Sequence, residues 1–369
     1  MTTTNPEVAA KTPGEDVEGL DHEEPTPVNG YPIDSLMIRT DRRTVFEVCR
    51  RINSGIYILD PEFQRDFIWD ELKQSRLIES AIMRIPLPVF YLAETTQGKI
   101  MVVDGLQRLS TFRRFLAGEL RLRGLTYAEE MNKKRFDDLP LTIRNRVEDT
   151  SLTLYLIDSK VPDRAKIDIF ERVNSGEPLT KQQMRNCLYL GEATRWLARM
   201  AKREEFLSAT ARGLNHKTMR DRECINRFLA FTELGLSPYT GNMDNFLRDV
   251  LIRLQNADAD YWKTMTERFL TSMELNEAIF GQHAFRKTKV GEKPRRSMIN
   301  VALFDVLSVL LARPEADRFR NRSDTIHKKL SELLEDENFL DSITLATNSL
   351  RKVKLRFEKV ERMLTEVST

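Results

Sequence analysis

The stretch KIMVVDGLQRLSTFRRFLAG, residues 99–118, joins a short apolar strand directly to a helix. Its first five residues are mostly apolar and β-branched, which is typical of a buried strand. In its second half the apolar side chains recur at helical spacing until a glycine ends the pattern. Only Asp104-Gly105 separates the two parts, so the stretch predicts a strand–turn–helix junction.

Such a junction has two interpretations. The first backbone N–H groups of the helix lack partners and carry a partial positive charge, which favours an anion. Arg108 adds a cation in the first turn, where a residue that served only the helix dipole would more often be acidic. Alternatively, Asp104 merely caps the helix. The stretch alone leaves both possibilities open.

Length and charge restrict the class of protein. A chain of 369 residues can form two domains, or one with a large helical addition. Residues 1–30 hold seven acids and one lysine, so a net charge of −6 precedes a remainder of +8. We expect this acidic tail to be disordered. The mildly basic remainder is compatible with nucleic acid without being diagnostic of it.

The sequence also excludes several kinds of site. Its three cysteines are far apart and form no CxxC motif, which indicates a reducing compartment. It has no apolar run of membrane-spanning length and no signal peptide, so we expect a cytoplasmic protein without membrane contact. The motifs GxxxxGK[ST], GxSxG, HExxH and GxGxxG are missing, and four scattered histidines make a histidine-metal nuclease improbable.

The hydrophobic pattern predicts an α+β fold. Before Pro162 short apolar runs alternate with helical patterns, and after it the pattern is helical to the end. We therefore expect a small mixed-sheet domain over 31–160 and a helical domain over 161–369. The expected strands are 56–59, 89–93, 99–103 and 151–157, and the expected helices begin at 42, 71, 106, 141, 164 and 181. The first helix would be capped by Thr40 or Asp41.

Two further patterns lie in the helical half. Apolar residues alternate three and four apart from Ile343 to Leu364, which predicts a terminal helix that docks on its own bundle or forms a coiled coil. A stretch with six cations and one acid could follow a DNA backbone or could be a solvated loop. Its cations are Arg286, Lys287, Lys289, Lys293, Arg295 and Arg296.

Several motifs in the same order resemble the N-terminal domain of GmrSD modification-dependent restriction endonucleases, also found in phosphorothioate-sensing SspE proteins. The matching segments are Pro61–Arg65 with Trp69, Ile85–Pro88, Asp104–Thr111, Phe170–Gly176 with Leu179-Thr180, and Met184–Asn186. This family carries a DGQQR motif on a ParB/sulfiredoxin-like fold. The resemblance covers about residues 31–190 and implies a phosphate-binding turn at Asp104–Arg108.

The resemblance implies a role for each residue of this site. Arg108 and Arg65 would clamp phosphate oxygens of a nucleoside triphosphate. Asp104 would hold Mg²⁺ or orient water, and Gln107 would position that water or the γ-phosphate. Gly105 and Gln64 would line the nucleotide site. From the helical side, Arg172, Asn174 and Arg185 would complete it.

The resemblance implies an NTP-hydrolysing module of a bacterial restriction or antiphage system that acts on or near DNA. Leu106 stands where the family usually has glutamine, which puts hydrolysis in question. We find no HNH-type nuclease sequence, so a separate nuclease subunit is one partner that the resemblance implies. The alternatives are a non-enzymatic DNA-binding or sensor subunit, and a phosphodiesterase that cuts DNA at the ParB-like site.

Overall fold

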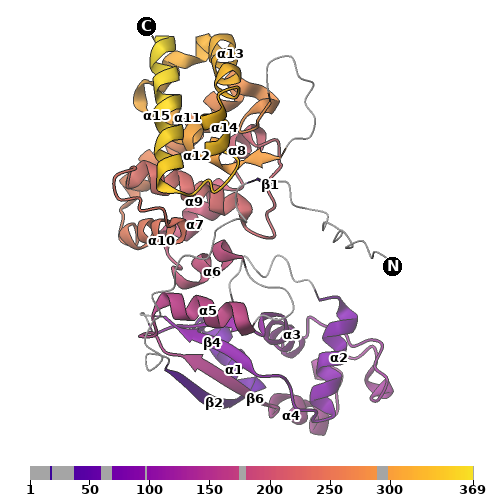
Figure 1. Cartoon of the computed structure of the whole chain (residues 1–369). Helices are drawn as coiled ribbons and strands as arrows, with labels where there is room; N and C mark the ends of the chain where they lie inside the picture. Colours follow the sequence, from indigo (N-terminus) through magenta and orange to yellow (C-terminus); the bar gives the residue numbers. More distant parts are fainter. Residues whose placement is uncertain are drawn as a thin grey trace, which may run out of the picture. The chain divides into compact units, whose positions relative to one another are not determined.

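The computed structural model has a mixed β-sheet in the first half of the chain and a helical bundle in the second (Figure 1). It describes residues 17–18, 37–59, 69–95, 98–173, 180–288 and 298–368. The chain divides into a unit of residues 29–179, here called the sheet unit, and a helical unit that combines residues 1–28 with 180–369. The predicted α+β fold class is confirmed. The division falls after residue 179, so helix α5 (Asp163–Val173) lies in the sheet unit.

Five strands form the sheet in the order β2-β6-β4-β5-β3. Their bounds are β2 Ile38–Thr44, β6 Ser151–Ile157, β4 Phe90–Glu94, β5 Ile100–Asp104 and β3 Tyr57–Ile58. The β2–β6 and β4–β5 pairs are antiparallel, whereas β4–β6 and β3–β5 are parallel. The antiparallel β4–β5 pair is the hairpin that the sequence predicts.

Strand β2 differs from the prediction. The sequence favoured a helix capped by Thr40 or Asp41, but Ile38–Thr44 pairs along its whole length with β6. Helix α1 (Val45–Asn53) begins only afterwards, and the Thr44 side chain caps it by accepting the N–H of Glu47. Six of the strand's seven residues are polar or charged because it is an edge of the sheet and faces solvent.

Helices pack on the sheet through one continuous core. Alternate residues of β6, namely Leu152, Leu154 and Leu156, belong to the same buried cluster as the inward faces of α1 and α2. Helix α5 contacts β5. The remaining helices are α2 Glu71–Ile82, α3 Leu106–Leu116 and α4 Leu141–Glu148, with short 3₁₀ turns η3 Glu129–Met131 and η4 Phe136–Asp138.

The helical unit surrounds an aromatic core. Phe269 lies 5.0 Å from Phe228 and 5.8 Å from Trp196, measured between ring centroids. A two-stranded parallel pair joins β1 (Val17–Glu18) to β7 (Ile299–Asn300). The helices are α6 Lys181–Leu188, α7 Glu192–Met200, α8 Glu204–Ala209, α9 Arg220–Glu233, α10 Met243–Arg253, α11 Ala259–Phe280, α12 Val301–Leu310, α13 Ser323–Leu333, α14 Glu337–Ser342 and α15 Leu350–Ser368, with 3₁₀ turns η5 Gly281–His283 and η6 Pro314–Arg322.

The terminal helix docks on its own unit. Val353, Phe357, Val360 and Leu364 of α15 are buried in the helical core, which confirms docking. The helix begins at Leu350, later than the apolar pattern suggests, because Ala346 has a positive φ of 41° that interrupts the helix. No helix in the described ranges is long and apolar enough to cross a membrane.

Candidate functional site

The junction between β5 and α3 is built as the sequence predicts. Strand β5 ends at Asp104, and Gly105 occupies the helix N-cap position with φ 98° and ψ 10°. No side chain caps α3, so Asp104 does not have the capping role considered above. The first-turn N–H groups of α3 therefore keep their capacity to bind an anion.

Only glycine fits at position 105. Its φ lies in the left-handed region, which residues with a Cβ rarely adopt. A Cβ built there would lie 2.2 Å from Cδ1 of Phe90, far inside van der Waals contact. The glycine of the motif is thus required by the backbone and by the close approach of Phe90.

Arg108 is anchored to the two residues that come just before β4. Its guanidinium donates to the carbonyl oxygens of Pro88 at 2.5 Å and Val89 at 3.1 Å. It also donates to Oδ2 of Asp104 at 2.7 Å. These contacts use three of the five N–H donors of an arginine. Arg108 therefore has a structural role in fixing the junction and retains donors for a ligand.

The electrostatics of the junction follow from partial burial. The side chains of Arg108 and Asp104 are 12% and 31% exposed. Burial lowers the pKa of Arg108, and the adjacent Asp104 carboxylate opposes this shift. Because a guanidinium stays protonated over the physiological range, the junction holds a permanent ion pair.

Gln107 connects α3 to the start of α2. Its Oε1 lies 3.5 Å from the backbone nitrogen of Trp69, and the Trp69 carbonyl accepts the Gln74 amide at 2.8 Å. Gln74, which is 2% exposed, in turn accepts from Arg114 at 2.9 Å. Sequence reasoning missed Gln74 as a supporting residue, because nothing in a helical pattern distinguishes it from other polar positions.

Among the described residues of the junction, Asp104 supplies the carboxylate that a metal could bind. No group of three or more potential ligands occurs among the residues that the structure describes. Oδ2 of Asp104 is held by Arg108, which leaves Oδ1 for a cation. Mg²⁺ is commonly held by one or two carboxylates together with substrate phosphates. The single carboxylate therefore fits a magnesium ion that arrives with a triphosphate.

The structure describes only part of the remaining predicted ligands of the nucleotide. Gln64, Arg65 and Asn174 lie outside the described residues. Arg172 is exposed in the last turn of α5, within the sheet unit. The structure therefore brings Asp104, Gly105, Gln107 and Arg108 together and leaves the contribution of the other residues as a prediction.

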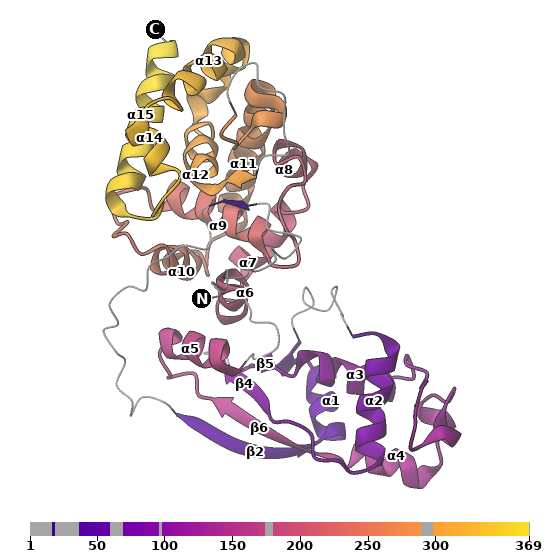
Figure 2. The ribbon, with the colours of Figure 1, turned by 45° about the vertical axis from the view of Figure 1, so that its right-hand side comes forward.

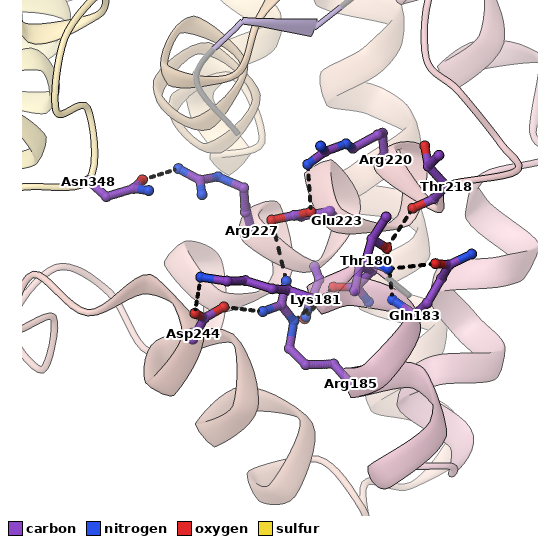
Figure 3. A network of polar contacts seen from close by, with 12 residues as sticks. Thr180, Lys181, Gln183, Arg185, Thr218, Arg220, Glu223, Arg227, Asp244 and Asn348 are labelled. Atoms are coloured by element: carbon purple, nitrogen blue, oxygen red, sulfur yellow. Dashed lines mark hydrogen bonds and ion pairs between the residues drawn. The ribbon is translucent and has the colours of Figure 1, made fainter. Parts of the chain in front are cut away.

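Arg185 belongs to a buried network in the helical unit (Figure 3). Its guanidinium is 3% exposed and donates to Oδ1 of Asp244 at 2.5 Å. Glu223 lies 3.3 Å away, and Oε1 of Gln182 accepts at 3.0 Å. Two carboxylates thus accompany this cation, which connects α6 with α9 and α10.

The basic stretch also divides into two parts. Arg286 is 9% exposed and donates to the carbonyl oxygens of Gln282, Ala284 and Thr210, so it supports the fold in this arrangement. Lys287 pairs with Glu18 at 2.5 Å. The other cations, Lys289, Lys293, Arg295 and Arg296, lie outside the described residues. Their contact with DNA stays a prediction.

Comparison with known proteins supports the family resemblance. The family model described as GmrSD restriction endonuclease, N-terminal domain, matches residues 45–190. No curated protein matches the chain. The matched segment contains the whole β5–α3 junction. The resemblance of this segment is thus confirmed.

Proposed function

We propose that this chain, whose residues 45–190 match the N-terminal domain of GmrSD restriction endonucleases, binds and hydrolyses a nucleoside triphosphate in a bacterial restriction or antiphage system. The observation that carries the proposal is the uncapped start of α3 directly after Asp104-Gly105. A helix start without a side-chain cap and with an adjacent arginine is suited to a phosphate group.

The phosphate would be held mainly by backbone groups. The first-turn N–H groups of α3 point along the helix axis, and the helix dipole adds a partial positive charge. The remaining donors of Arg108 would bind a further phosphate oxygen. Gly105 would orient the first-turn N–H groups through its left-handed backbone conformation.

Asp104 and Gln107 would supply the rest of the chemistry. Oδ1 of Asp104 would hold Mg²⁺, which neutralises charge on a triphosphate. The Gln107 amide would orient the attacking water. To do so it would give up its long 3.5 Å contact with the Trp69 nitrogen. DNA and a separately encoded nuclease subunit are the partners that a restriction system would add.

One observation favours a non-enzymatic sensor as the second candidate. Leu106 is half-buried and packs against the core of the sheet unit, where the family usually has an amide side chain. If that amide orients water in hydrolysing relatives, this chain would bind a nucleotide without turnover. The two candidates share the binding site and differ only in hydrolysis.

Calorimetric titration of the full chain with magnesium nucleotides tests the binding. A charge-assisted hydrogen bond contributes about 1.5–3 kcal/mol, so Arg108→Ala should weaken binding by about 10- to 100-fold. Arg113→Ala, which removes a charge from the same helix away from the junction, is the matched control. Gln107→Glu places a negative charge beside the phosphate and tests the site without disturbing the anchor of Arg108.

The outcomes separate the candidates. Equal affinity in the wild type and in folded Arg108→Ala and Gln107→Glu variants would contradict the site. Binding with hydrolysis supports the NTPase, with or without stimulation by DNA. Binding without hydrolysis supports the sensor.

A further inference from the structure

The N-terminal segment contributes a strand to the helical unit. Val17 and Glu18 pair in parallel with Ile299 and Asn300, and Figure 2 shows β1 as a short dark strand within that unit. The pairing spans only two residues on each strand. Such a short pairing contributes little binding free energy through the main chain. The side chains must therefore determine whether Val17–Glu18 stays bound to β7.

The Glu18 carboxylate has two partners in the helical unit. Oε2 accepts the Nδ2 amide of Asn300 at 3.1 Å, and Oε1 accepts Nζ of Lys287 at 2.5 Å. The side chains of Glu18 and Lys287 are 24% and 27% exposed, and Asn300 is fully buried. A buried amide donor and a half-buried cation together select an acidic side chain.

The fold holds Asn300 in place independently of Glu18. Oδ1 of Asn300 caps α12 by accepting the Leu303 N–H at 2.9 Å, and its Nδ2 also donates to the Ile343 carbonyl at 2.7 Å. The Asn300 N–H donates to the Phe285 carbonyl at 2.8 Å. The Asn300 amide is therefore oriented in advance, as a binding site requires.

We propose that β7 and Lys287 form a peptide-binding slot for an extended segment with an acidic side chain, and that Val17–Glu18 is its resident ligand. Strand addition gives affinity through the main chain, and the Lys287–Asn300 pair gives specificity for the carboxylate. Because the resident segment pairs over only two residues, it can be exchanged for another peptide of the same chemistry.

A charge reversal in the full chain opens the slot. Glu18→Lys repels Lys287 and releases the resident segment. A fluorescent peptide of residues 11–22 should then bind with an affinity about tenfold or more above its affinity for the wild type, where the tethered segment competes. Its Glu18→Gln version, which keeps the other acids, should bind about tenfold more weakly to the opened chain.

Further variants separate recognition from general charge. Glu361→Lys reverses a surface acid of the helical unit that pairs with Arg313, and it should leave peptide binding at the wild-type level. In the Glu18→Lys, Lys287→Glu chain, the charges are complementary again. This chain should exclude the wild-type peptide and regain hydrogen-exchange protection at Val17–Glu18 and Ile299–Asn300.

Two results would overturn the slot. One is equal peptide binding to the wild type and to Glu18→Lys, because the resident segment would then not occupy the same place. The other is the absence of binding to a folded Glu18→Lys chain. Neither result depends on nucleotide or DNA binding. These experiments therefore test the slot independently of the proposed function.

Discussion

The guanidinium carbon of Arg108 lies 4.1 Å from the centroid of the Phe90 ring, so a cation covers the first residue of β4. The same ring lies where a Cβ on Gly105 would have to be. Phe90 thus sets the shape of the junction from a strand next to the motif. The Phe90 ring thus accounts both for the glycine at position 105 and for the packing of the Arg108 guanidinium.

Gly105→Ala should destabilise the sheet unit strongly. The left-handed backbone costs an alanine roughly 1–2 kcal/mol, and the overlap with Phe90 adds about 1–3 kcal/mol. Gly118→Ala, at the other end of α3, has a similar φ of 72° with no atom within 4 Å of the added Cβ, so it should show only the backbone cost. Chemical denaturation, monitored by hydrogen exchange in β5 and α3, compares the two variants. Equal losses would rule out the overlap.

Asp305→Asn should unfold or severely weaken the helical unit. Asp305 is fully buried and accepts from Arg227 at 2.8 and 2.7 Å and from Arg356 at 2.9 Å. Removing its charge leaves two buried guanidinium groups with no carboxylate between them, at a cost of about 3–5 kcal/mol. Trp196 and Trp262 both lie in this unit, so urea denaturation read by fluorescence measures the loss.

The surface pair Arg313–Glu361 gives the contrast for that experiment. Its side chains are 43% and 49% exposed. Glu361→Gln should cost no more than about 1 kcal/mol because solvent screens the pair. A comparable loss in the two variants would show that burial does not determine the contribution of these charges.

The helical unit should lose stability in mild acid through His327. Burial and the neighbouring His283 lower the pKa of His327, Asp324 opposes this shift, and Nε2 has no hydrogen-bond partner. The unfolded chain therefore binds the proton more readily, and stability falls as pH drops below about 6.5. His327→Phe should reduce the fall in melting temperature between pH 7.5 and 5.5. An unchanged fall would assign the pH dependence to other groups.

This chain alone should not cleave unmodified duplex DNA. Hydrolysis of a phosphodiester needs an activated water and usually one or two metal ions, whereas Asp104 is a single carboxylate at the junction. The described residues include no larger cluster of metal ligands. Plasmid nicking with Mg²⁺ or Mn²⁺, with and without NTP, tests the expectation. Nicking that disappears in Asp104→Ala would establish direct cleavage at this site.

Much of the sheet was predictable because its central strands are short and largely apolar. Strands β4, β5 and β6 lie within about one residue of the predicted runs. Strand β2 was not, because an exposed edge needs no apolar alternation and its sequence IRTDRRT resembles a helix start. Its existence depends on β6, more than a hundred residues later.

The site was predictable in its backbone but not in its side-chain contacts. The apolar strand, Asp104-Gly105 and the helical pattern predict the strand–turn–helix junction, whereas the absence of a cap by Asp104 is seen only in the structure. The contacts of Arg108 with Pro88 and Val89 depend on how β4 meets β5, which the motif does not contain. Similarly, the position of Arg185 depends on Asp244, fifty-nine residues further along the chain.

The contact between Glu18 and Lys287 has a consequence for synthesis on the ribosome. The two residues are 269 positions apart, so at 5–20 residues per second roughly 15–50 s pass between their additions to the chain. The sheet unit is continuous from residue 29 to residue 179 and can fold within that interval. In a nascent chain, the segment that contains Glu18 is therefore synthesised well before the slot that binds it has formed.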